Sequence, residues 1–398
     1  MDRTEGSSRD GAVIVVLMVG AIVSLLAAGR SLAGIVPDYL AEGTAVALWS
    51  WDVANYWFAP RLALEGDWAT LADADAYIAV QERLAGSELS RRNWSYPPTM
   101  LLVLLPLGLM SLKAATAAFI VVTTLLFAWA AEAARRALVP DAPRWTVAVA
   151  TLAAFAVNVP DGQNGMLTGA ILLAVAANWH GRPVLAGLIL GLIVVKPHLG
   201  ILFPIAAVLD RNWRLIGATI VSAGGLVLAS FVAFGTEAWR SYAEIIVPYQ
   251  ADLPFHWGGW FHYKMLGAMG WAIREGAASS AWALHAPFAL VALLATVWAW
   301  SRSDGPQTRL LVLLVATLLA LPYAFDYDMA GALALAVLAA PALGGLRGTT
   351  VALLAVVPTM LAPLQWATGA PVATVILLAV LVAASLPRRV ERLATVSA

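Results

Sequence analysis

The residue whose surroundings most favour chemistry is Asp52, a single carboxylate in the aromatic stretch 49–57, which reads Trp-Ser-Trp-Asp-Val-Ala-Asn-Tyr-Trp. Tryptophan and tyrosine gather where lipid headgroups meet hydrocarbon. A carboxylate at that boundary is poorly solvated, so it must be paired, protonated or bound to a ligand. These residue types favour a catalytic base at a membrane surface. The alternative is a solvated acid that caps an interfacial helix.

A second chemical group is the sequence Lys196-Pro197-His198, which lies between two short apolar segments. A lysine in this position needs an anionic partner or a water-filled cavity. We expect Lys196, with His198, to bind a phosphate, for which lysine serves as a point charge. The alternative is that the lysine ammonium reaches out to the lipid headgroups.

Two polar turns could contact a substrate. The turn 161–165 reads Asp-Gly-Gln-Asn-Gly, and the side-chain amides of Gln163 and Asn164 could bind sugar hydroxyls. A plain turn is the alternative, because Asp-Gly and Asn-Gly are strong turn formers. The turn 323–328 supplies Asp326 and Asp328 between two apolar segments, and it too could be an ordinary external turn.

Metal chemistry is weakly supported. The loop 236–280 holds His256 and His262 among tryptophans and tyrosines, but no cysteine or nearby acid completes a metal site. Such aromatic faces suit a carbohydrate or an interfacial lid. Asp73 and Asp75 have the spacing of the metal-nucleotide motif of soluble sugar transferases, but they lie in an alanine-rich stretch that predicts a helix. We therefore expect no metal.

The elements that position these groups are membrane helices. The chain of 398 residues is 61% hydrophobic and 12% charged, whereas soluble domains carry about 25% charged residues. Its mean hydropathy is +0.80. The alternation typical of a membrane barrel is absent, so we predict an all-α integral membrane protein. The net charge is zero and no basic run predicts nucleic-acid binding.

The apolar segments number thirteen, and one of them decides the topology. They lie near 12–29, 97–110, 112–138, 146–157, 166–179, 184–195, 198–209, 215–235, 281–300, 310–322, 329–346, 349–366 and 371–386. The segment 97–110 is short, begins with Pro97-Pro98 and contains Pro106. If it does not cross the membrane, fourteen of the 24 basic residues fall on the cytoplasmic side. The positive-inside rule therefore favours about twelve spans with both termini in the cytoplasm.

This topology makes residues 1–398 one multi-pass transmembrane domain with two long outer loops. The first loop, 30–111, would include juxtamembrane helices, and the second is 236–280. Segments 146–157, 184–195 and 198–209 would form helices of about 18 Å, against a hydrocarbon core of about 30 Å. Pro160 and Pro197 favour helices that stop short and leave a cavity over helices that continue through the polar motifs.

Together these residues resemble the GT-C superfamily of membrane glycosyltransferases, and most closely glycosyltransferase family 87, known for polyprenol-phosphate-mannose-dependent mannosyltransferases. The resemblance rests on Asp52, on Tyr96-Pro97-Pro98 followed by Pro106-Leu107, on Gly162-Gln163 and on Lys196-Pro197. It follows nearly the whole chain in order. The Gly-Gln and Lys-Pro pairs at this spacing are its most specific part.

The resemblance implies an inverting sugar transfer at the outer face of a bacterial cytoplasmic membrane, within a GT-C type helical bundle. The donor would be a polyprenyl-phosphate sugar, the acceptor a glycolipid or glycan, and no cofactor or metal would take part. Asp52 would be the base, and Lys196 with His198 would bind the donor phosphate. Tyr96, Gln163 and Asn164 are expected sugar or acceptor contacts. His262, Asp326 and Asp328 match no motif of the family, and we add them to these contacts as hypotheses. The alternative is a transporter or lipid flippase, which would show repeated halves and midplane charges.

Overall fold

The computed structural model describes residues 3–40, 52–89, 93–302 and 305–386. Every regular element in these ranges is a helix, and the one β-type pairing recorded among them is an isolated bridge between Met265 and Phe325. The expected all-α fold is therefore confirmed. The aromatic stretch is described only from Asp52 onward, so Trp49 and Trp51 lie outside the described residues.

Five helices of the described chain are long and apolar enough to cross a membrane. They are α1 (Arg3–Leu40), α7 (Leu112–Leu138), α12 (Trp213–Ser241) with its continuation through α13 (Val247–His256), α16 (Ala281–Ser301) and α18 (Ala330–Leu343) with the turn before it. Seven further apolar helical segments have 10–17 residues. The expected count of about twelve spans is not confirmed and stays a prediction.

Two segments differ from the apolar runs that predicted them. Helix α1 continues to Leu40, well beyond the apolar segment 12–29. The segment 349–366 is a broken pair, α19 (Gly345–Ala352) with η7 (Leu353–Ala355) and then α20 (Val357–Thr368), bent by 81°. Pro358 lies in the first turn of α20, and its missing N–H cannot continue the hydrogen bonding of the preceding helix.

The short helices end at the polar motifs. Helix α8 (Trp145–Asn158) gives way to the 3-10 turn η1 (Val159–Asp161), and α9 (Gly165–Asn178) begins after it. Helix α10 (Pro183–Gly191) is followed by η2 (Leu192–Val195), η3 (Pro197–Gly200) and α11 (Phe203–Leu209). Because a residue before proline avoids the α conformation, Lys196 adopts φ −146° and separates η2 from η3.

The centre of the bundle is built from buried helices, two of which, α9 (Gly165–Asn178) and α18, are rich in glycine and alanine. Helices α9, α17 (Pro306–Ala320) and α18 are almost wholly buried, and α21 (Val372–Ser385) packs beside α17. Glycine and alanine allow helix backbones to approach closely. At the contact of α9 with α18, a Cβ built on Gly331 would lie 3.4 Å from the Gly169 Cα.

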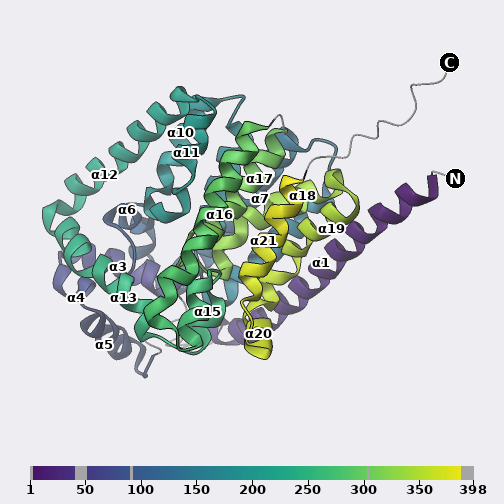
Figure 1. Ribbon diagram of the computed structural model, residues 1–398. Coiled ribbons are helices and arrows are strands. Elements are labelled where there is room, and N and C mark those ends of the chain that lie inside the picture. Colours follow the sequence, from purple (N-terminus) through teal and green to yellow (C-terminus); the bar gives the residue numbers. More distant parts are fainter. Residues whose placement is uncertain (1–2, 41–51, 90–92, 303–304, 387–398) are drawn as a thin grey trace, which may run out of the picture.

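One end of the bundle carries short helices and turns. In Figure 1 the helices α3 (Val53–Glu65), α4 (Trp68–Ala72) and α5 (Ala74–Ala85) lie at the same end as α13 and α15 (Ala268–Arg274). Helix α6 (Pro98–Gly108) has 11 residues, which corresponds to about 16 Å and is too short to span a bilayer. Asp73 is the N-cap of α5 and accepts hydrogen bonds from the Asp75 and Ala76 amides, so it is a helix cap, as expected for this alanine-rich stretch.

Candidate active site

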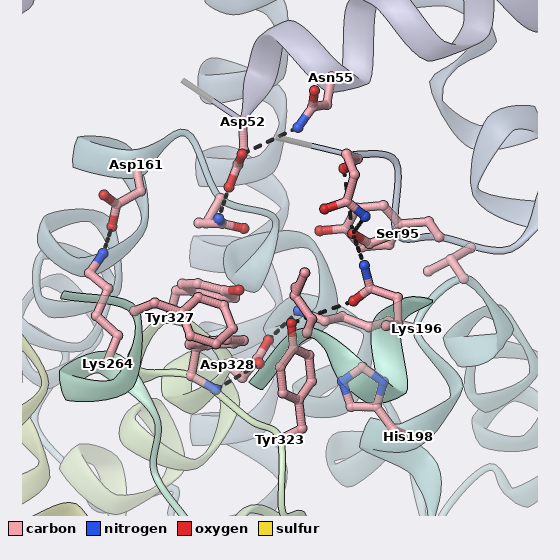
Figure 2. Close-up of a pocket in the computed structure, with 18 of the residues that line it drawn as sticks. Asp52, Asn55, Ser95, Asp161, Lys196, His198, Lys264, Tyr323, Tyr327 and Asp328 are labelled. Carbon is pink, nitrogen blue, oxygen red and sulfur yellow. Dashed lines mark hydrogen bonds and ion pairs between the residues drawn. The ribbon is translucent and has the colours of Figure 1, made fainter. Parts of the chain in front are cut away.

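A cavity of about 390 Å³ lies where the short helices, the loop before α6 and the turn before α18 meet. Six of the nine residues expected at a site line it: Asp52, Tyr96, Gln163, Lys196, His198 and Asp328. Figure 2 shows Asp52, Lys196, His198 and Asp328 around this space. The tertiary structure thus brings together groups that the chain separates by more than 250 positions.

Asp52 occupies the N-cap position of α3, but its carboxylate makes no capping hydrogen bond. Instead it accepts hydrogen bonds from the side-chain amides of Gln163 and of Asn55, the latter at 3.3 Å. The Asp52 backbone N–H donates to the carbonyl of Asp161 at 3.0 Å. The helix-cap alternative therefore does not describe this carboxylate, which is oriented by the turn 161–163.

Gln163 connects Asp52 to a pair of tyrosines. Its amide nitrogen donates to Asp52, and its amide oxygen accepts from the Tyr56 hydroxyl at 3.4 Å, so the two contacts together fix the amide's orientation. The Tyr56 and Tyr96 hydroxyl oxygens are 3.2 Å apart. Burial, and then the nearby Asp52 carboxylate, raise the pKa of Tyr96 well above its ordinary value. Tyr96 is therefore a neutral hydroxyl that can donate a hydrogen bond at the cavity wall.

Lys196 is buried and points inward, so it does not reach out to the lipid headgroups. Its ammonium forms an ion pair with Asp328, donates to the Asn164 side-chain oxygen at 3.3 Å and lies 4.9 Å from the centroid of the Tyr327 ring. The second Asp328 oxygen accepts from the Phe325 backbone N–H at 3.1 Å. A buried lysine needs such an anionic partner, and here the partner belongs to the protein.

The remaining expected residues occupy different places. His198 is half-buried and lines the cavity, and Asn164 is buried behind Lys196. His262 and Asp326 are not among the residues that line the cavity. His262 is buried with its Nε2 2.7 Å from the Pro254 carbonyl, and the Asp326 carboxylate accepts from the Tyr327 N–H at 2.9 Å. Their polar atoms bind the protein's own backbone, which leaves the substrate contacts expected of them without structural support.

The turns 161–165 and 325–328 pack closely against each other at Gly165, where there is no room for a side chain. A Cβ built on Gly165 would lie 1.9 Å from the Tyr327 carbonyl oxygen and 2.4 Å from the Asn158 side-chain oxygen. The Asn158 amide donates to the Ala154 carbonyl at 2.9 Å and to the Tyr327 carbonyl at 3.4 Å. The Gln163 side of the cavity is thereby held against the Asp328 side.

Two features of the cavity depend on the second long loop, whose position the sequence does not predict. Lys264, from α14 (Trp260–Lys264), forms an ion pair with Asp161 across 103 positions. One wall consists of aromatic rings from the second long loop and the turn before α18: Trp257, Phe261, Tyr323, Phe325 and Tyr327. The aromatic composition of both segments predicts a surface that binds a ligand. The sequence does not predict that Lys264 lies beside Asp161.

The described residues contain no group of three or more histidine, cysteine, aspartate or glutamate side chains placed to hold a metal ion. The expectation that neither metal nor cofactor takes part stays a prediction. The cavity instead offers hydrogen-bonding amides and hydroxyls, two lysines in ion pairs and an aromatic wall.

Comparison with curated proteins gave no match, and comparison with solved structures gave none either. The family model described as glycosyltransferase family 87 matches residues 94–322. The match spans more than half of the chain and includes Tyr96, Gln163 and Lys196, while Asp52 and Asp328 lie on either side of it. The family indicates a glycosyltransferase, and several apolar helices indicate a membrane protein. The chain belongs to glycosyltransferase family 87, as its Tyr-Pro-Pro, Gly-Gln and Lys-Pro motifs led us to expect.

Proposed function

We propose that the protein is an inverting glycosyltransferase that moves a sugar from a polyprenyl-phosphate donor to a hydroxyl of a glycolipid or glycan. The observation that carries the proposal is the presence of Asp52 and Lys196 in one cavity. A carboxylate and an ammonium in one cavity can serve the two ends of a displacement, because one removes a proton from the nucleophile while the other stabilises the leaving phosphate.

In the proposed reaction Asp52 takes the proton of the acceptor hydroxyl as its oxygen attacks the anomeric carbon. The new carbon–oxygen bond forms on one face of the sugar, and the bond to the donor phosphate breaks on the opposite face, which inverts the configuration. The phosphate leaves with the electron pair. Gln163 and Asn55 hold the carboxylate through their hydrogen bonds, so that it meets the hydroxyl in one orientation.

Lys196 is the proposed contact for the donor phosphate. A lysine ammonium carries three N–H donors, and Asp328 and Asn164 accept two of them in the described contacts. The third can donate to a phosphate oxygen. A polyprenyl-phosphate sugar is a phosphodiester with one negative charge, so a hydrogen bond from the Lys196 ammonium stabilises it. His198, on the same wall, is placed to assist.

The aromatic wall and the arginine distribution support the remaining parts of the proposal. Half-exposed rings such as Trp257 and Tyr323 present apolar faces of the kind that bind sugars or isoprenoid chains. In the proposed topology, most of the arginines lie in the segments on the opposite side of the membrane from the cavity motifs. The positive-inside rule therefore favours a cavity on the outer face and both termini in the cytoplasm. In a bacterium this is the outer face of the cytoplasmic membrane, where membrane lipids surround the donor.

The test compares the wild type with Asp52→Asn in membranes supplied with radiolabelled polyprenyl-phosphate sugars. We expect transfer to fall by about 10²- to 10⁴-fold, the usual contribution of a general base. Glu237→Gln is the control, because Glu237 is exposed and lies outside the cavity lining. Equal transfer by the wild type and Asp52→Asn would refute the assignment of Asp52 as the base. Movement of the lipid-linked sugar across the membrane without product would instead favour a transporter or flippase.

A further inference from the structure

Besides its aromatic rings, the second long loop contributes the cation Lys264 to the cavity lining. Its ammonium pairs with the Asp161 carboxylate, and its side chain is 18% exposed. In Figure 2 the Lys264 side chain extends from its helix toward Asp161, on the side of the cavity away from His198. Burial opposes the charge, but Asp326 and then Asp161 outweigh it and raise the pKa of Lys264 above its ordinary value. Lys264 is therefore a permanent cation in this position.

Hydrogen bonds join the turn that contains Asp161 to Asp52. The Asp161 carbonyl accepts the Asp52 backbone N–H at 3.0 Å, and Gln163, two residues later, donates to the Asp52 carboxylate. Gly162 between them has φ +65°, which suits glycine, and the Gln163 N–H donates to the Asn158 carbonyl at 2.8 Å. A displacement of Asp161 would therefore move both the backbone and the hydrogen-bond donor that orient Asp52.

The other end of the Lys264 contact is also held firmly. The Gln365 amide of α20 donates to the Tyr263 carbonyl at 2.6 Å and to the Met265 carbonyl at 3.3 Å. The Leu266 N–H donates to the Ala324 carbonyl at 2.9 Å, beside the turn before α18. The ion pair thus joins two well-anchored parts of the protein, the loop around 263–266 and the turn 161–163.

We propose that Lys264 is a positioning residue for the transfer reaction. By pairing with Asp161 it holds the turn 161–163 against Asp52, so that the carboxylate faces the acceptor hydroxyl. This inference rests on the proposed function, in which Asp52 is the base. Lys264 acts through Asp161, and its removal affects the rate of the chemical step more than the binding of the donor.

The first experiment measures kcat and KM for the polyprenyl-phosphate sugar in Lys264→Met, Lys264→Arg and Asp161→Asn. We expect kcat to fall by about 10- to 100-fold in Lys264→Met and Asp161→Asn, the cost of a misplaced catalytic group, with KM changed less than about threefold. Lys264→Arg should restore part of kcat because it keeps the charge. The double variant should be no worse than either single variant, because both remove the same contact.

Arg274→Met is the matched control. Arg274 belongs to the same long loop and is similarly buried; it pairs with Glu275, donates to the Gly369 carbonyl at 2.7 Å and lies 4.6 Å from the centroid of the Tyr263 ring. It does not line the cavity. If Arg274→Met lowers kcat as much as Lys264→Met does, the effect is a general loosening of the loop and the positioning role is wrong.

The second experiment needs no substrate. A hydrophobic carbodiimide couples to protonated carboxyl groups, and mass spectrometry of the purified protein gives the pH at which half of Asp52 is coupled. In Lys264→Met the Asp161 charge is unbalanced beside Asp52, so the midpoint should move to higher pH. In Asp161→Asn a negative charge near Asp52 is removed, so the midpoint should move to lower pH. The titratable groups that interact with Asp52 include Tyr56, Tyr96, Asp161, Lys264, Tyr323 and Tyr327.

The two experiments separate this inference from the proposed function. Opposite midpoint shifts in Lys264→Met and Asp161→Asn, with similar losses of kcat, support the positioning role. Unchanged midpoints and an unchanged kcat in Lys264→Met overturn it. If the wild type transfers no sugar but the opposite shifts are found, the coupling of Lys264 to Asp52 stands and the proposed reaction fails.

Discussion

Removing the Lys196 ammonium should destabilise the protein, because it leaves a buried carboxylate without its counter-charge. In Lys196→Met the side chain keeps most of its apolar length, but Asp328 loses its counter-charge while its side chain is only 1% exposed. Breaking a buried ion pair by removing one partner costs about 3–5 kcal/mol. The Phe325 N–H still donates to Asp328, but one neutral donor does not replace an ammonium.

The loss of unfolding free energy in Lys196→Met should therefore be about 3–5 kcal/mol, because the Asp328 carboxylate stays buried without its cation. Thermal unfolding of detergent-purified protein at pH 7 measures this loss.

The double variant Lys196→Met with Asp328→Asn should recover most of the stability, since no buried charge remains, and should still fail to bind the donor. Arg240→Met is the control, because it breaks an exposed pair with Glu237 at 3.1 Å and should cost at most about 1 kcal/mol. The reasoning is refuted if Lys196→Met is as stable as this control at pH 7, or if the double variant is no more stable than the single one.

Three further outcomes are expected. Gly165→Ala should destabilise the protein by about 3 kcal/mol or more, because its Cβ would lie 1.9 Å from the Tyr327 carbonyl oxygen. Gly217→Ala is the control and should not destabilise it, because no atom lies within 4 Å of its Cβ. Thermal unfolding compares the two variants. Gln163→Leu should lower kcat by about 10- to 100-fold in the radiolabel assay, and an unchanged kcat would show that its hydrogen bond to Asp52 is dispensable. Burial raises the pKa of Tyr96 and Tyr323 above the ordinary value of 10.0. Their contribution to stability is therefore full below pH 10 and is lost as the pH rises further. The unfolding temperature should fall faster above pH 10 in the wild type than in Tyr323→Phe, and equal rates of fall would contradict this.

The family match and the proposed chemistry rely on different parts of the chain. The match covers Tyr96, Gln163 and Lys196. Asp52, the proposed base, and Asp328, the ion-pair partner of Lys196, lie outside it. Asp52 and Asp328 stand out in the sequence by themselves, and the folded chain places both in the same cavity as the matched motifs. Variants of these two residues therefore test the proposed chemistry independently of the family assignment.

The sequence by itself determined the class of the protein and most of the site. A composition of 61% hydrophobic residues predicts membrane helices, because so much apolar surface cannot be buried in a soluble core. Against that background Asp52, Lys196 and the polar turns stood out, since charges near a bilayer are costly unless they have a use. Pro160 and Pro197 marked where helices end, because proline removes a backbone donor.

Only the tertiary structure decided which groups meet. The contacts of Gln163 with Asp52, of Lys264 with Asp161 and of Lys196 with Asp328 join residues 111, 103 and 132 positions apart. Periodicity and turn signals describe neighbours within a few residues, so they carry no information on such distances. The same limit explains His262 and Asp326, whose residue types suited a sugar but whose polar atoms bind nearby backbone groups. Which buried polar groups have a partner in the protein is settled by packing, since each must find its hydrogen bonds where the fold places it.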